Sequence, residues 1–240
     1  FDYKELFGHV QAVSIAAPTV NHYQIAREFL LSGVNVLVEK PFTTTLKEAD
    51  SLLKIAQGKK LLVQVGHIER FNSAFEAIKH ICKDPKFIEV HRLSGFPGRS
   101  LDVGVVLDLM IHDIDILLGL IDSPIKRVEA VGINVLTKYE DIANVRLTFK
   151  NGCVANLTAS RISDESMRKI RIFLPHTYIS LDYKNEEADI YRKDGEKISK
   201  EAIWIKKEEP LKKELSSFLD CVIHKQRPLV SGIEGRQALA

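Results

Sequence analysis

We predict an α/β fold in which part of a doubly wound parallel sheet is followed by an α+β domain with a large, mostly antiparallel open sheet. In residues 1–85, short apolar runs alternate with segments of helical periodicity, which indicates β-α-β units. From residue 86 onward, apolar and polar residues mostly alternate with a period of two, as in antiparallel strands. We therefore expect one domain over 1–85 and a second over 86–240.

The first domain is predicted to contain three strands, each followed by a helix. The helix expected over 45–58 begins with a capping box, Thr45 and Glu48, and ends at Gly58. The other expected helices cover 21–33 and 72–82, and the strands cover 10–17, 34–40 and 60–66. Strands that are apolar throughout are typical of a parallel sheet covered on both faces.

The second domain is predicted to combine one apolar helix, over 105–120, with a series of strands that starts at 86–95. Asn151 and Gly152 lie between two alternating runs, which favours a hairpin. Residues 184–213 are dense in charges of both signs. We interpret them as a solvated edge and loop, since a binding patch usually has one dominant sign.

The composition is that of an ordinary globular protein. The 240 residues are 45% hydrophobic, and 34 basic residues nearly balance 32 acidic ones. This balance argues against a nucleic-acid or membrane-surface binder. No apolar run is long enough to span a bilayer. The three cysteines lie far apart in sequence, so we expect a reducing compartment, the cytoplasm, and no disulfide framework.

Ligands of an open parallel sheet bind beyond the carboxyl ends of its strands. The second strand ends in Glu39, Lys40 and Pro41, and an ammonium group at such a position can stabilise negative charge that develops on a hydroxyl or carbonyl. The alternative is a surface ion pair between Glu39 and Lys40, and this segment alone favours neither interpretation.

The apolar helix over 105–120 favours the catalytic interpretation. Asp108, His112 and Asp115 follow one another at i, i+4 and i+7, on one face of a helix that is otherwise apolar nearly all round. An aspartate can orient a histidine and support its cationic form, as a catalytic base requires. The alternative is a core histidine that links the helix to the sheet, but the accompanying acidic residues favour catalysis.

Two other kinds of chemistry fit less well. The potential metal ligands His67, Glu69, Asp108, His112 and Asp113 match no compact ligand motif, so we expect no metal. Cys153 follows the predicted hairpin turn with no base indicated near it, which disfavours a nucleophilic cysteine.

Four stretches, taken together, resemble the glucose–fructose oxidoreductase and inositol dehydrogenase family, Gfo/Idh/MocA. They are, in chain order, "AVSIAAPTVNHYQIAREFLLSGVNVLVEKPFTTTLKEAD", "VQVGHIERFNSAF", "DVGVVLDLMIHDIDIL" and "RPLVSGIEGRQALA". The resemblance implies an N-terminal Rossmann domain that binds NAD or NADP, and a C-terminal α/β domain whose open sheet forms homodimers or homotetramers. It also implies a small-molecule substrate, without nucleic acid or membrane.

The resemblance also implies roles for individual residues. Lys40 corresponds to the catalytic lysine of the family's Glu-Lys-Pro motif, and Asp108 and His112 to its Asp-x-x-x-His pair, with His112 accepting the hydroxyl proton. The bond before Pro41 is often cis in such proteins. The residues implied to bind the cofactor are Ala17, Pro18, Thr19, His22, Glu39, Lys40 and Pro41. Those expected to bind the substrate are His67, Arg70, Asn72, Asp108, His112 and Arg161.

One departure from the family pattern concerns the N-terminus. The family's Gly-x-Gly-x-x-Gly turn is absent, and the strands start with what would be about the fourth of a Rossmann domain. We expect that about sixty to seventy residues are missing, either omitted from this sequence or absent from a natural fragment. Without the helix terminus that binds the pyrophosphate, the chain as given is expected to be inactive.

The substrate implied is a sugar. The stretch "DVGVVLDLMIHDIDIL" most resembles the nucleotide-sugar branch, in which a UDP-linked N-acetylhexosamine is oxidised at C3. Arg99, Arg161 and Arg168 are candidates for contacts with its diphosphate, although each is more often a surface charge. The alternatives are a free sugar or inositol dehydrogenase, and a non-catalytic, ligand-sensing member of the family.

Overall fold

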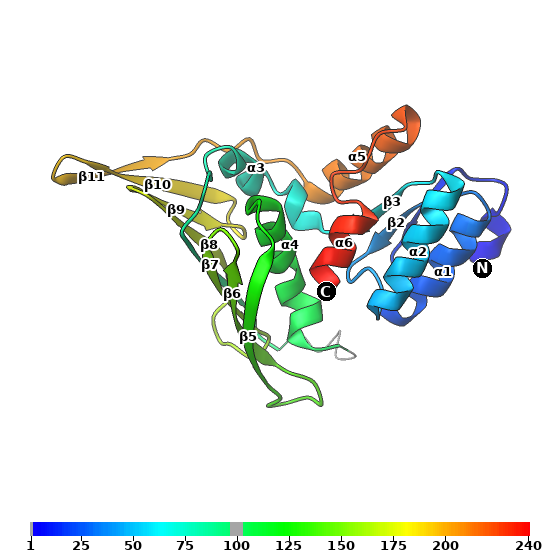
Figure 1. The fold of residues 1–240 in the computed structure, drawn as a ribbon, viewed down its shortest axis with the longest axis horizontal. Helices are drawn as coiled ribbons and strands as arrows, with labels where there is room; N and C mark the ends of the chain where they lie inside the picture. The colour runs from blue at the N-terminus through cyan, green and yellow to red at the C-terminus, as the bar shows by residue number, and fades with distance from the viewer. Residues whose placement is uncertain (1, 97–102) are drawn as a thin grey trace. The chain divides into compact units, whose positions relative to one another are not determined.

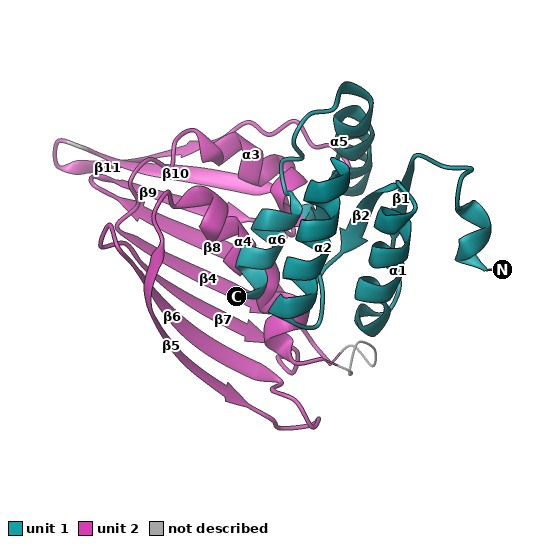
Figure 2. Ribbon diagram, turned by 45° about the vertical axis from the view of Figure 1, so that its right-hand side comes forward, with its two compact units in different colours: residues 1–68, 210–240 teal, residues 69–209 magenta. Residues whose placement is uncertain are grey.

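The computed structural model describes residues 2–96 and 103–240, and Arg99 therefore lies outside the described residues. The chain forms two compact units (Figure 2), one built from residues up to 68 together with 210–240, the other from residues 69–209. We call them unit 1 and unit 2 and describe each by itself. Among the described residues, no helix combines the length and apolarity needed to cross a membrane.

This division differs from the expected domains in two respects: the first boundary lies at 68/69 instead of 85/86, and the C-terminal segment 210–240 returns to the first unit. The N–H of Val65 donates to the carbonyl of Val230 at 3.0 Å, and Gln64 forms a β-bridge with Ser231. These contacts join residues more than 160 positions apart, which local sequence patterns do not reveal.

Unit 1 contains a three-stranded parallel sheet in the order β1-β2-β3. Two of these strands, β2 and β3, are labelled in Figure 1. The three predicted strands and the first two predicted helices are thus present in unit 1, whereas the third predicted helix, Ser73–Lys79, belongs to unit 2. The capping box of Thr45 and Glu48 is present at the start of α2. This helix ends at Lys59, beyond the predicted Gly58, and the capping residue Lys60 has the left-handed conformation. The elements of unit 1 are η1 (Tyr3–Leu6), β1 (Ala12–Ile15), α1 (Thr19–Leu31), β2 (Asn35–Glu39), α2 (Leu46–Lys59), β3 (Val63–Gly66), α5 (Pro210–His224) and α6 (Gly232–Leu239).

Unit 2 is built around an eight-stranded sheet in the order β11-β10-β9-β8-β4-β7-β6-β5. All neighbouring strands are antiparallel except β4 and β7, which are parallel, so the predicted mostly antiparallel sheet is confirmed. Its first elements are η2 (Ile68–Phe71), α3 (Ser73–Lys79), β4 (Phe87–Leu93), η3 (Val106–Met110) and α4 (Ile111–Leu120). The remaining strands are β5 (Ile125–Ile133), β6 (Ile142–Phe149), β7 (Val154–Ser160), β8 (Met167–Leu174), β9 (Thr177–Asp182), β10 (Glu187–Asp194) and β11 (Lys197–Ala202).

The core of unit 2 lies between one face of this sheet and the helices α3 and α4 (Figure 2). In the central strands, every second side chain is buried, as in Ile88 and Val90 of β4 or Ala155 and Leu157 of β7. This alternation is the period-two pattern seen in the sequence, and it assigns the apolar side chains to the helical side. The predicted hairpin at Asn151 and Gly152 connects β6 to β7.

Two segments differ from the expected secondary structure. The helix predicted over 105–120 begins with a π-helical turn, Val106–Met110, before the α-helix α4. The charged segment 184–213, interpreted from the sequence as a solvated edge and loop, holds two strands, β10 and β11, of which β11 is the exposed edge of the sheet. All residues of β11 are exposed at the edge of the sheet, so its side chains lack the apolar alternation that would have indicated a strand.

Two glycines of unit 1 are expected to respond oppositely to alanine. A Cβ at Gly235 in α6 would overlap the Val65 side chain in β3, whereas one at Gly58 in α2 would meet no atom within 4 Å. Gly235→Ala should therefore lower the free energy of unfolding by about 1–3 kcal/mol. Gly58→Ala should raise it by about 0.5–1 kcal/mol, since alanine is the better helix former. Urea denaturation of both variants tests this, and equal effects would contradict the close packing of α6 on β3.

Candidate active site

The carboxyl ends of β1 and β2 are held together by one histidine. His22 in α1 is 1% exposed, and its Nδ1 and Nε2 lie 2.9 Å from the carbonyl oxygen of Pro41 and 2.8 Å from that of Ala17. The first carbonyl follows Lys40 and the second precedes Pro18 and Thr19. Because both ring nitrogens contact the backbone, His22 joins the two loops and has no ring nitrogen left for a ligand.

Lys40 is half-buried directly after β2, and its bond to Pro41 is cis, as the resemblance implies. The Glu39 carboxylate accepts a hydrogen bond from the Lys40 backbone N–H at 3.3 Å. A Cβ at Gly66 would lie only 2.9 Å from this carboxylate, so the glycine at the end of β3 leaves room for Glu39. The ends of β2 and β3 are thus fitted to each other around one carboxylate.

A second carboxyl group lies under these strand ends. Glu214 in α5 is fully buried, and its backbone carbonyl accepts a hydrogen bond from Gln64 Nε2 at 3.3 Å. Within the described residues, neither carboxyl oxygen of Glu214 has a hydrogen-bond partner. Burial, with a contribution from the charge of Glu39, raises the pKa of Glu214 to about 8, so its neutral form predominates at neutral pH.

In unit 2, Arg70 and Asp115 form a buried ion pair, with Nε of Arg70 2.7 Å from the Asp115 carboxylate. A Cβ at Gly119 would overlap the guanidinium of Arg70, so the arginine fits across α4 only because this position is glycine. Asn72 caps α3 through the Ala74 N–H and donates to Glu69 at 3.3 Å. Arg70 and Asn72, expected at the substrate, thus have internal partners as well.

Arg92 in β4 connects two further carboxylates. Its Nε and Nη2 each lie 2.8 Å from an oxygen of Asp113 in α4, and its Nη1 lies 3.0 Å from Glu69. Burial alone would lower the pKa of Arg92, but the charges of Asp113 and Glu69 raise it above its ordinary value. The guanidinium also lies over the ring of Tyr183, 5.9 Å from its centre.

Asp108 and His112 have a different environment from their acidic neighbours. Asp113 and Asp115 are buried and paired with arginines, whereas Asp108 and His112 are only half-buried, on the π-helical turn and at the start of α4. The polar residues of this helix therefore divide into two sets. Asp108 and His112 are the half-buried set, and their expected catalytic role stays a prediction.

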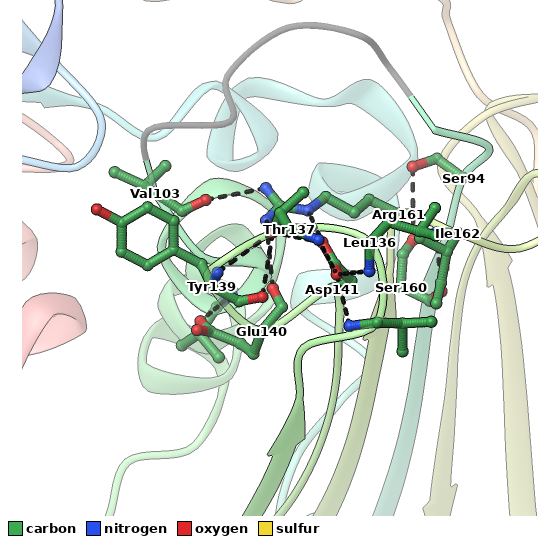
Figure 3. Close-up of polar contacts among 12 residues, drawn as sticks. Ser94, Val103, Leu136, Thr137, Tyr139, Glu140, Asp141, Ser160, Arg161 and Ile162 are labelled. Atoms are coloured by element: carbon green, nitrogen blue, oxygen red, sulfur yellow. Dashed lines mark hydrogen bonds and ion pairs between the residues drawn. The ribbon is translucent and has the colours of Figure 1, made fainter.

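Arg161, expected to bind the substrate, is fully buried at the end of β7. Its Nε lies 2.9 Å from Asp141, and its other nitrogens donate to the Val103 carbonyl, the Thr137 hydroxyl and the Glu140 carbonyl (Figure 3). Burial opposes ionisation of Asp141, but N–H groups of residues 135–137 hold its pKa well below the ordinary value. Arg161 is thus bound by its own chain, which disfavours the expected contact with a diphosphate.

Sequence reasoning missed Glu214 and Glu140. For Glu214 a signal exists, because it shares one face of α5 with buried Phe218 and Cys221, at i, i+4 and i+7. For Glu140 the sequence holds no signal, since its partners lie 34 and 35 residues away. His67 is buried at the end of β3, and it remains a predicted substrate residue. Among the described residues, no three metal-ligating side chains come together.

Unit 1 has two features at the end of β1 that are suited to ligand binding. A groove runs along β1 to Ala16 and Ala17, at the carboxyl end where such sheets bind ligands. Ala16 and Pro18 are exposed there and have compact side chains, which allow close approach to the backbone. A parallel α/β unit together with an α+β unit built on an open, mostly antiparallel sheet is the two-part architecture expected of a dinucleotide-binding oxidoreductase.

Comparisons with known proteins agree with this class. Residues 1–67 match a family model described as an oxidoreductase family with an NAD-binding Rossmann fold, and residues 85–178 match the GFO/IDH/MocA C-terminal domain. The chain therefore belongs to the Gfo/Idh/MocA oxidoreductase family, and the predicted family and nicotinamide cofactor are confirmed.

Two relatives and two structures illustrate the range of similarity. The chain is 37% identical to the UDP-N-acetylglucosamine 3-dehydrogenase of Acidithiobacillus ferrooxidans, over 98% of this chain and 77% of that protein. A structure of that enzyme matches with a TM-score of 0.94, covering 99% of this chain and 78% of the other. The uncharacterized oxidoreductase YrbE of Bacillus subtilis is 28% identical over 67% of this chain and 52% of its own length. The structure of an inositol dehydrogenase homolog from Azotobacter vinelandii, complexed with NADH and myo-inositol, matches with a TM-score of 0.86 at 18% identity. The match covers 99% of this chain and 77% of the other, and it shows a shared fold.

The raised pKa of Glu214 gives a prediction for stability against pH. The pKa of Glu214 has its ordinary value of 4.5 in the unfolded chain and is raised to about 8 in the folded protein. Its contribution to the free energy of unfolding should thus be complete below pH 4.5 and fall as the pH rises to 8. Glu214→Gln, which stays neutral, should remove this fall of about 1.4 kcal/mol per pH unit.

Chemical denaturation between pH 5 and 9 measures this difference between wild type and Glu214→Gln. Asp220→Asn, an exposed change on the same helix, is the matched control and should run parallel to wild type. If the wild type and Glu214→Gln also run parallel, Glu214 is not held neutral.

Proposed function

We propose that this chain is the larger part of an NAD(P)-dependent dehydrogenase that oxidises a secondary hydroxyl of a UDP-linked N-acetylhexosamine, at C3. The observation that supports this most is the 37% identity to a UDP-N-acetylglucosamine 3-dehydrogenase over nearly the whole chain. The half-buried Asp108 and His112, beside two fully paired aspartates, are consistent with a substrate-facing pair.

The proposed mechanism uses three side chains. His112 accepts the proton of the reacting hydroxyl, and Asp108, one helical turn earlier, supports the resulting imidazolium. The role of the Lys40 ammonium group is to stabilise negative charge that develops on a hydroxyl or carbonyl oxygen. The nicotinamide, when bound, supplies the hydride acceptor.

The cofactor would be held by the loops after β1 and β2. Ala17, Pro18 and Thr19 provide the first of these loops, and Glu39, Lys40 and Pro41 the second. His22, whose ring nitrogens contact both, fixes their separation and acts as a positioning residue. His67, Arg70 and Asn72 stay predicted substrate residues, and a reducing, cytoplasmic location is proposed from the three cysteines, which are free and buried.

The catalytic roles are tested in the full-length enzyme that contains this chain. Lys40→Ala and His112→Ala should each lower kcat with UDP-N-acetylglucosamine at least a hundredfold, because a proton acceptor and a charge-stabilising group are lost. NADH formation is followed by absorbance, and folding by circular dichroism. The matched controls are Lys47→Ala and His80→Ala, which remove exposed side chains of the same types.

Wild-type-like turnover in either catalytic variant would remove that residue from the mechanism. Binding of the UDP-sugar by calorimetry without turnover, with NAD and with NADP, would instead identify a ligand sensor and end the dehydrogenase proposal. Turnover of myo-inositol but not of UDP-sugars would support the dehydrogenase reaction but contradict the proposed UDP-sugar substrate.

We also propose that two copies associate through the second face of the eight-stranded sheet. On this face the rings of Phe173, Tyr178 and Tyr191 stack across β8, β9 and β10 at 4.9 and 5.0 Å between centres. Thr158, on β7 in the middle of the sheet, is half-buried, and its hydroxyl accepts from Asn144 at 2.9 Å. The same face carries the ion pairs Arg171–Glu89 and Lys169–Asp182, so its charges are already balanced within one copy. A broad face of stacked rings and internally paired polar groups suits association of identical surfaces.

Light scattering of the full-length protein at micromolar concentration should give a dimer or tetramer. Thr158→Arg should shift it toward a monomer, because it adds a charge at the centre of the self-associating face. Lys197→Glu, at the exposed edge strand β11, is the control and should leave the mass unchanged. A monomeric wild type would contradict the proposal.

A further inference from the structure

The helix that bears Asp108 and His112 begins without a cap of its own. The residue before its first turn is Val105, whose side chain cannot accept a hydrogen bond, and no side-chain cap from this position exists. The first N–H groups of a helix have no partner within the helix and need acceptors from elsewhere. The start of this helix therefore depends on another part of unit 2.

Glu140, in the loop between β5 and β6, supplies these acceptors. Its backbone carbonyl accepts from the Val105 N–H at 2.9 Å, and its Oε1 accepts from the Val106 N–H at 3.3 Å. A negative charge at a helix N-terminus is also favourable to the helix dipole. Glu140 thus caps a helix that starts 34 residues before it in the sequence.

Gly104 makes room for this cap. A Cβ at this position would overlap the Glu140 carboxylate, so any larger residue would displace the carboxylate from the helix start. The Gly104 carbonyl also accepts the first helical hydrogen bond, from the Asp108 N–H at 3.0 Å. The carboxylate and the backbone of Asp108 are therefore placed by the same residue.

Arg161 contacts both the segment that precedes the helix and the loop that contains the capping residue Glu140. Its Nη1 donates to the Val103 carbonyl at 2.9 Å, and its Nη2 lies 3.4 Å from the Glu140 carbonyl (Figure 3). The Arg161 backbone N–H donates to the Asp141 carbonyl at 3.0 Å, and its Nε pairs with the Asp141 carboxylate. The segment before the helix and the loop that caps it are thus held by one guanidinium group.

We propose that Glu140 and Arg161 are positioning residues for the Asp108–His112 pair, because they fix where the catalytic helix starts and how its first turn is oriented. The proposal rests on the proposed function, since the pair matters for catalysis only if His112 is the proton acceptor. Neither residue contacts the substrate in this role.

The test uses the full-length enzyme and three substitutions. Glu140→Ala removes the side-chain acceptor, Gly104→Ala displaces it, and Glu140→Gln keeps an acceptor oxygen without the charge. Kinetics with NAD and UDP-N-acetylglucosamine give kcat and KM separately, and hydrogen exchange measures protection of the Val106 N–H. Glu201→Gln, in an ion pair with Arg192 on β10 and β11, is the control for loss of a carboxylate elsewhere on the same sheet.

We expect Glu140→Ala and Gly104→Ala to lower kcat at least tenfold with KM for NAD unchanged, and to lose protection at Val106. Glu140→Gln should recover most of the kcat lost in Glu140→Ala, and Glu201→Gln should match wild type. Unchanged protection of the Val106 N–H in both alanine variants would contradict the capping role of Glu140. A second outcome is that the alanine variants lose protection of the Val106 N–H but keep the wild-type kcat. If His112→Ala inactivates the enzyme, this outcome would overturn the positioning role. An active His112→Ala enzyme would reject the proposed function, and the proposed positioning role with it, while the exchange data still test the cap.

Discussion

The buried ion pair between Arg161 and Asp141 joins three parts of unit 2 that are far apart in the sequence. Arg161 ends β7, Asp141 ends the loop between β5 and β6, and the Val103 carbonyl precedes the helix. Two charges removed from water are costly unless their hydrogen-bonding groups are satisfied. Here the Asp141 carboxylate accepts from the N–H groups of residues 135–137 and from the Thr137 hydroxyl, so the charge organises the loop around it.

The other buried arginines of unit 2 follow the same rule. Arg70 pairs with Asp115, and Arg92 pairs with Asp113 and Glu69, so two of the carboxylates on α4 are neutralised by partners from η2 and β4. Replacing one partner of such a pair leaves an unpaired buried charge, which costs about 3–5 kcal/mol. These pairs therefore fix the rotation of α4 about its axis. Asp108 and His112 are the polar residues of the helix that remain at least partly accessible.

The sequence was sufficient for the parts of the fold that local patterns determine. Apolar strands and amphipathic helices repeated in order, so the parallel sheet was predictable, and so was the mostly antiparallel sheet from its alternation. The return of residues 210–240 to unit 1 was not, because it depends on pairings such as Val65 with Val230 that local patterns do not encode.

Individual site residues show the same limit. Lys40 and the Asp108–His112 pair stand in recognisable motifs, whereas the partners of Arg161 are set by tertiary contacts. An isolated arginine in the sequence can equally well contact a ligand or a buried aspartate, and only the structure distinguishes the two. The full burial of Arg161 was therefore not predictable, and neither was the cap that Glu140 provides.

The divided composition of unit 1 has a consequence for biosynthesis. Unit 2 is one continuous segment, 69–209, whereas unit 1 needs residues 210–240 to cover β3. On the ribosome, domains generally fold as they emerge from the exit tunnel. Unit 2 can therefore fold while translation continues, but the nucleotide-binding unit must wait for the last helix, α6. Until then β3 is an open edge, at which a chaperone or another nascent chain can bind.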